Sequence, residues 1–143
     1  MHWTTHLIAG CSLGYLIGRP GPAALAGLCS HVLLDMLPHH DPDSELGYAA
    51  DSAVGLACLA GIAASRRFHK ELGDAALWGA IGSGLPDVEL TIKLFRHIED
   101  ERYLFPSHNG RHPHRETPLL ESTVLQTATA AVFFSWSRLR EGP

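Results

Sequence analysis

Apolar residues run along this chain in long blocks, and turn-forming or charged residues separate the blocks. The blocks cover about residues 4–18, 23–37, 47–67, 72–82, 85–97 and 118–138. Each is long enough for a helix, and small residues outnumber β-branched ones, which favours packed helices over sheets. The pattern predicts an all-α fold: a compact bundle of about five to six helices with small-residue packing, in a single domain over residues 1–143.

The first block carries a ridge of small residues. His6, Gly10, Gly14 and Gly18 follow one another at intervals of four, so they share one face of a helix. A glycine ridge lets a second helix approach closely. Because His6 heads this ridge, we expect it to face a neighbouring helix, although a helix-end histidine without a special role is the plainer alternative.

The second block contains the most informative polar pair. His31 and Asp35 are four residues apart in an apolar run, so they project from one helical face. Burying an ionised carboxylate without a partner costs several kcal/mol, and a shared cation would remove that cost. Pro38 ends this helix, and a corner with His39 and Asp41 follows. We therefore expect a metal site between helices at this point.

Two more acidic positions are candidates for the same site. Asp51 lies one turn into the third helix, where it either complements the helix N-terminus or acts as a ligand. The segment 85–89 (LPDVE) repeats the pattern of 37–41 (LPHHD), with Asp87 and Glu89 at the positions of His39 and Asp41. Proline and acids also make an ordinary helix start. If the repeat is real, the two polar corners should lie close together.

A histidine-rich stretch at about 98–117 has no clear period. It contains His108, His112 and His114 with Arg111 and Arg115. An irregular connection of this length in a compact domain is unusual and is often functional.

Composition limits the remaining possibilities. The net charge of −4 arises before residue 66, where one arginine faces five acids, and ten histidines are present in the whole chain. No basic stripe indicates a nucleic-acid partner. The three cysteines lie in apolar runs without a CxxC pair, which indicates small buried hydrophobes in a reducing compartment. We expect a cytoplasmic or inner-membrane-associated protein that is not secreted. The uncharged runs fit either core helices or short membrane-associated spans.

Several of these elements together resemble a known family. Residues 5–10 (THLIAG), the SHxxxD helix at 30–35 (SHVLLD) and the proline corner at 85–89 (LPDVE) are similar to motifs of the membrane-bound metal-dependent hydrolases, the YdjM-like family. Residues 114–117 (HRET) match part of its HRGxTHS motif. A more distant resemblance is to the zinc-dependent phospholipase C group. The resemblance implies a helical fold and a metal-dependent hydrolase acting on a small-molecule or lipid phosphoester.

Histidine and carboxylate ligands without thiolates suit zinc, or iron or manganese, and the number of candidates would support two ions. The expected ligands are His6, His31, Asp35, His39, Asp51 and Asp87. Asp41 or Glu89 would accept a proton from the attacking water, and His114 and Arg115 would meet the substrate phosphate. One competing hypothesis is a helical or membrane protein that binds metal without catalysis. Another is a polar core without metal, in which every buried acid finds a hydrogen-bond partner.

Overall fold

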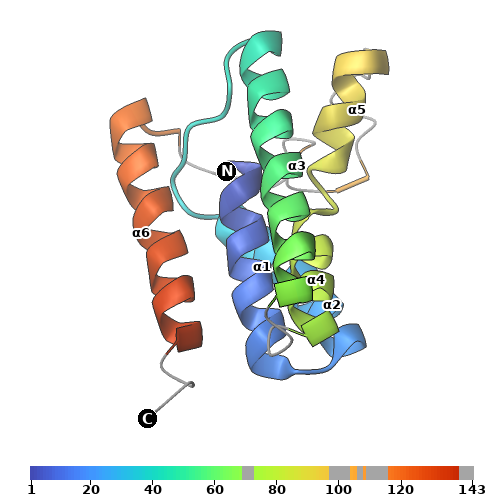
Figure 1. Cartoon of the computed structure of the whole chain (residues 1–143). Helices are drawn as coiled ribbons and strands as arrows, with labels where there is room; N and C mark the ends of the chain where they lie inside the picture. Colours follow the sequence, from blue (N-terminus) through green and yellow to red (C-terminus); the bar gives the residue numbers. More distant parts are fainter. Residues whose placement is uncertain (69–72, 97–103, 106–107, 109–115, 139–143) are drawn as a thin grey trace.

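The chain folds into a bundle of α-helices, as the sequence predicts (Figure 1). The structure is a computed structural model that describes all residues except 69–72, 97–103, 106–107, 109–115 and 139–143. Its helices are α1 (Trp3–Ile17), α2 (Pro20–Asp35), α3 (Glu45–Phe68), α4 (Gly73–Gly84), α5 (Val88–Arg96) and α6 (Leu119–Arg138). Within the described ranges the β-type pairing is limited to an isolated bridge between His39 and Glu116. The all-α prediction is confirmed.

The helix boundaries differ from the predicted ones mainly at prolines. Helix α2 begins at Pro20, three residues before the expected start, because the first helical turn has no need of a backbone donor and tolerates proline. The segment predicted as a turn, 19–22, is therefore largely helical. In contrast, Pro86 and Asp87 belong to the turn that precedes α5 rather than to its first turn.

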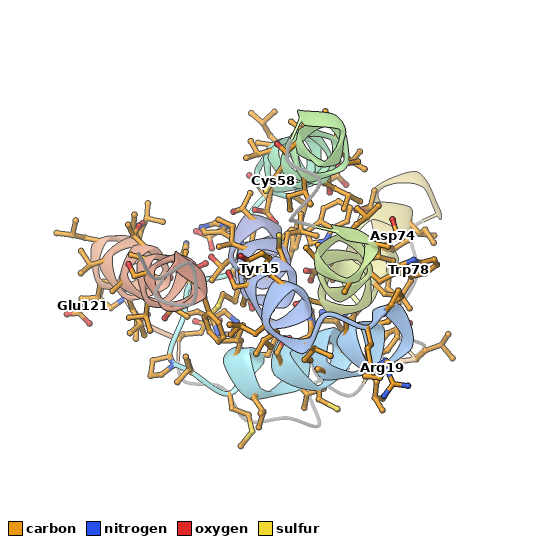
Figure 2. The ribbon with its side chains drawn as sticks, turned by 60° about the horizontal axis from the view of Figure 1, so that its bottom comes forward. Tyr15, Arg19, Cys58, Asp74, Trp78 and Glu121 are labelled. Atoms are coloured by element: carbon orange, nitrogen blue, oxygen red, sulfur yellow. The ribbon has the colours of Figure 1, made fainter. Side chains whose placement is uncertain are left out.

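Helices α1, α2 and α4 pack closely through glycine (Figure 2). A Cβ atom added at Gly10 would overlap the carbonyl oxygen of Gly79, and one added at Gly79 would overlap that of Gly10. Gly14 meets the backbone of Ala75 in the same way. The predicted ridge on α1 is thus a contact surface for α4 up to Gly14, whereas Gly18 caps the helix in a left-handed conformation (φ 71°).

The interior of this three-helix unit is polar as well as apolar. Its buried apolar residues are mostly alanines, joined by Trp3, Leu7 and Leu34. His6 and His31 are both fully buried, and so is Ser83. Such polar side chains require partners inside the bundle, and they are the residues that define the candidate site. Of the cysteines, Cys11 and Cys58 are partly buried, but Cys29 is exposed, so its predicted burial is wrong.

Helices α3 and α6 flank α1 on different sides and leave apolar faces uncovered (Figures 1 and 2). Exposed large side chains include Leu46, Val54 and Leu56 on α3, and Leu120, Val124 and Val132 on α6. Within the 21-residue stretch Glu45–Ser65 of α3, the most apolar 18-residue window has a mean hydropathy of 1.5, and only 11% of this window is buried. By length and composition, this helix could cross a membrane.

Candidate metal centre

The centre of the site is the pair on α2. His31 is fully buried and Asp35 is 6% exposed, and their spacing of four residues brings the imidazole Nε2 to 2.9 Å from Asp35 Oδ2. The predicted juxtaposition of these two side chains on one helical face is therefore present. The pair points into the bundle between α1 and α4 because α2 packs on both helices.

Helix α1 adds the third member. His6 Nε2 lies 3.0 Å from Asp35 Oδ1, and its ring stacks on that of His31 with centroids 4.0 Å apart. His6 is fully buried, as its position at the head of the glycine ridge predicts. The two oxygens of Asp35 thus each face one imidazole, and His6, His31 and Asp35 form a group with the geometry to hold a metal ion.

A second group adjoins the first and shares His31 with it. It contains Asp87, from the turn before α5, and His108. His108 Nε2 lies 3.5 Å from Asp87 Oδ1 and 4.0 Å from Asp35 Oδ2, and the His108 ring meets that of His31 edge-on at 5.5 Å. Asp87, a predicted ligand, therefore joins the site, while the corner at residues 39–41 belongs to neither group.

Within each group, the separations between the facing imidazole and carboxylate atoms suit ligands of one ion. Two atoms that bind the same zinc lie at most about 4.2 Å apart, twice the usual metal–ligand distance of about 2.1 Å. The separations of 2.9 and 3.0 Å in the first group and of 3.5 Å in the second all fall within this limit.

Helix α4 contacts both histidines through Ser83, at the ring of His31 and at the backbone of His6. The Ser83 carbonyl accepts a hydrogen bond from His31 Nδ1 at 2.8 Å, and the Ser83 hydroxyl donates to the His6 carbonyl at 2.7 Å. A carbonyl can only accept, so His31 carries a proton on Nδ1, and in the neutral ring Nε2 presents its lone pair towards Asp35. A metal-binding histidine is usually held in this way, by a backbone carbonyl on its other nitrogen.

Several buried polar atoms of the site lack a hydrogen-bond partner among the described residues. They are His6 Nδ1, His31 Nε2 and Asp87 Oδ2. Although His31 Nε2 is close to Asp35, the pair does not have hydrogen-bond geometry. Buried polar groups in folded proteins are nearly always paired, so the unpartnered His31 Nε2, which lies 2.9 Å from Asp35 Oδ2, supports the fit of a cation.

Electrostatic interactions keep the buried carboxylate of Asp35 ionised. Burial acts to raise the pKa of Asp35, but contacts with His31 and His6 outweigh it and hold that pKa well below its usual range. Burial lowers the pKa of His6 below its ordinary value in spite of the carboxylates of Asp87 and Asp35. For His31 burial also acts downward, yet the same carboxylates prevail and raise the pKa. The result is an ionised Asp35 between two imidazoles, a suitable environment for a cation.

The predicted corner ligand His39 is buried near this site but is held by other partners. Its Nδ1 donates to the Leu37 carbonyl at 2.7 Å, and its Nε2 lies 3.2 Å from Asp41 Oδ1. The amino group of Met1 lies between Asp41 and Asp35, at 3.4 and 3.3 Å. The corner is thus connected to the site through Asp41 and Met1.

Asp51 has a different setting. Its carboxylate accepts the backbone N–H of Trp3 at 3.1 Å and contacts His2 Nδ1 at 3.1 Å. It thereby satisfies a free donor at the N-terminus of α1 and lies outside both groups of potential ligands.

Glu89 is close to the site but is engaged with a loop, since it accepts the backbone N–H groups of Leu104 and Phe105. The predicted substrate-binding residues His114 and Arg115 lie outside the described residues. The sequence analysis placed His108 in the irregular histidine-rich stretch without assigning it to the metal. No helical spacing relates His108 to the other candidate ligands, and only the length and irregularity of this histidine-rich stretch indicated a function there.

Comparison of the chain with protein-family models, curated proteins and solved structures gave no match. The helical bundle and the buried histidine–aspartate groups therefore define its class: an all-α protein with a potential metal-binding site between helices.

Proposed function

We propose that the protein is a metal-dependent hydrolase of a phosphoester, with the ion bound by His6, His31 and Asp35. The observation that carries this proposal is the buried, ionised Asp35 facing two imidazole nitrogens, one of which is oriented by the Ser83 carbonyl. Two histidines and one carboxylate form the ligand set of several catalytic zinc sites. The resemblance of the SHxxxD helix to metal-dependent hydrolases supports the same reaction class.

The residues around the group have distinct tasks in this proposal. A divalent ion bound there supplies Lewis acidity and makes water a good nucleophile near neutral pH. Asp87 accepts the proton of the attacking water, because its Oδ2 is buried without a hydrogen-bond partner beside the ligand group. Ser83 holds the His31 ring in the orientation that directs Nε2 to the ion.

Metal analysis and a phosphodiesterase assay test this proposal. Untagged protein should retain zinc, iron or manganese after gel filtration and hydrolyse bis(p-nitrophenyl) phosphate. Asp87→Asn should keep the metal and lose about 100-fold or more in rate, because general-base catalysis contributes about 10²–10⁴-fold.

Two outcomes would contradict the proposal. Folded protein that retains no transition metal would rule out the site. Metal-loaded protein that hydrolyses no phosphoester would instead support the non-catalytic metal-binding alternative, which the absence of a complete HRGxTHS motif favours.

We also propose that the protein associates with membranes through α3. The support is the length and hydropathy of the Glu45–Ser65 stretch together with its uncovered apolar face. Purified protein should float with phospholipid vesicles in a density gradient. Leu56→Glu, on the exposed face of α3, should abolish flotation, since a charge on an apolar face opposes membrane binding.

Leu25→Glu is the matched control for this variant, because Leu25 is also an exposed leucine but lies on α2. It should float as the unmodified protein does. If both variants float, or if the unmodified protein stays in the dense fraction, α3 is not a membrane-binding element.

A further inference from the structure

We infer that Glu89 is a positioning residue that holds His108 at the metal site, and that His108 serves as an additional ligand supplied by the loop. The inference rests on the proposed metal centre and assigns Glu89 a different task from the proton acceptor that the sequence suggested. It concerns how the site is assembled rather than how the reaction proceeds.

The contacts of Glu89 are with the backbone of the loop. Its Oε1 accepts the N–H of Leu104 at 3.0 Å, and its Oε2 accepts the N–H of Phe105 at 3.4 Å. Both carboxylate oxygens are therefore used to fix two consecutive peptide groups. Hydrogen bonds to a charged acceptor are stronger than neutral ones, so this pair is a firm attachment of the loop to the start of α5.

Hydrogen bonds also connect the segment held by Glu89 to His108, the proposed ligand. The backbone N–H of His108 donates to the Phe105 carbonyl at 3.0 Å, which connects His108 to a residue that Glu89 holds. Glu89 Oε2 also lies 3.8 Å from His108 Nδ1. These hydrogen bonds link the location of His108 to Phe105, whose own N–H is held by Glu89.

His108 is placed where a ligand would be. Its side chain is 7% exposed, and its Nε2 faces Asp87 Oδ1 at 3.5 Å and Asp35 Oδ2 at 4.0 Å. An imidazole on a loop loses conformational freedom when it binds an ion, and a loop fixed beforehand pays less of that cost. Glu89 should therefore affect metal affinity although it is not itself a proposed ligand.

The segment around the start of α5 supplies both the proposed proton acceptor and the positioning residue. Asp87 in the turn before α5 and Glu89 in the first turn of α5 are two residues apart. Asp87 faces the site directly, while Glu89 reaches it only through the loop. A proton acceptor and a positioning residue can be distinguished experimentally. Loss of an acceptor leaves metal binding intact, whereas loss of a positioning residue weakens it.

Cobalt(II) titration of the full chain, followed by visible absorption, tests the inference. We expect His108→Ala to weaken cobalt binding by about 10- to 100-fold and to change the absorption spectrum, because the ligand set changes. Glu89→Gln should weaken binding by about 10-fold, as changes to outer partners of metal ligands do. The double variant should bind no more weakly than His108→Ala alone, since Glu89 acts through His108.

Glu45→Gln is the control, because Glu45 is an exposed acid in the first turn of another helix; it should bind cobalt as the unmodified protein does. Thermal unfolding of the metal-free variants verifies that they fold. If Glu89→Gln does not fold, Glu89→Asp, which keeps both acceptor oxygens, replaces it and should show a smaller loss in the same direction.

The outcomes separate this inference from the proposed function. Unchanged cobalt affinity in Glu89→Gln, or additive losses in the double variant, would overturn the positioning role while the metal centre stands. Unchanged affinity in His108→Ala would overturn its role as a ligand. If the unmodified protein binds no cobalt, the metal centre fails and this inference fails with it. Metal binding without hydrolysis would remove only the enzymatic proposal.

Discussion

Replacing Asp35 by asparagine is expected to remove metal binding and hydrolysis together. Asp35 is the carboxylate that faces both His6 and His31, at 3.0 and 2.9 Å, and asparagine supplies neither its charge nor its second acceptor oxygen. Changes to residues that merely support a ligand cost 10- to 100-fold in affinity, so loss of this ligand should exceed about 100-fold. Competition with a chromophoric chelator measures the affinity, and elemental analysis gives the metal content.

Asp43→Asn is the matched control for this substitution. Asp43 lies on the corner after α2, its side chain is 79% exposed, and it contacts only His40 among the partners described for it. This variant should bind metal and hydrolyse substrate as the unmodified protein does. If Asp35→Asn retains the metal, the ion is not held at the His6–His31–Asp35 group, and the proposed mechanism is wrong.

The largest effect on stability is expected for Gly79→Ala. A Cβ at this position would overlap the Gly10 carbonyl oxygen and approach the Gly14 Cα to 2.9 Å. Both contacts are with the backbone of α1, so no side-chain rotation relieves them, and the two helices must move apart. Overpacking of this kind costs about 3 kcal/mol, and a chain of this size should lose roughly 10 °C in Tm. Thermal and urea unfolding measure both quantities.

Gly61→Ala serves as the comparison, because it makes the same chemical change in an exposed part of α3. A Cβ at Gly61 has no neighbour within 4 Å, and alanine has the higher helix propensity, so this variant should be unchanged or more stable by up to about 1 kcal/mol. Equal stability of the two variants would show that α1 and α4 are not in backbone contact.

The periodic part of the site could be predicted from the sequence. His31 and Asp35 share a helical face because of their spacing, and the cost of burying Asp35 alone indicates a cation. His6 heads a row of glycines, which predicts its burial against another helix. Each inference depends on residues within one helix, where backbone geometry relates spacing to direction, and the structure contains each arrangement.

The remaining assignments depended on contacts between distant segments. The sequence leaves two roles open for Asp51, a metal ligand or an acid that complements a helix N-terminus. The structure places its carboxylate at the N-terminus of α1, where it accepts the Trp3 N–H. His39 has ligand-like chemistry, yet its partners are Leu37 and Asp41. His108 comes from a stretch without periodicity, and hydrogen bonds connect it through Phe105 to Glu89.

By itself, the sequence determined the helices, the glycine-lined contact and the histidine–aspartate pair of α2, because each follows from local backbone geometry and the burial of apolar faces. Only the tertiary structure decided which acids and histidines from other helices and loops meet that pair. Such meetings depend on how α1, α2 and α4 approach one another and on which backbone donors bind each carboxylate. Residue spacing along one helix carries no information about either.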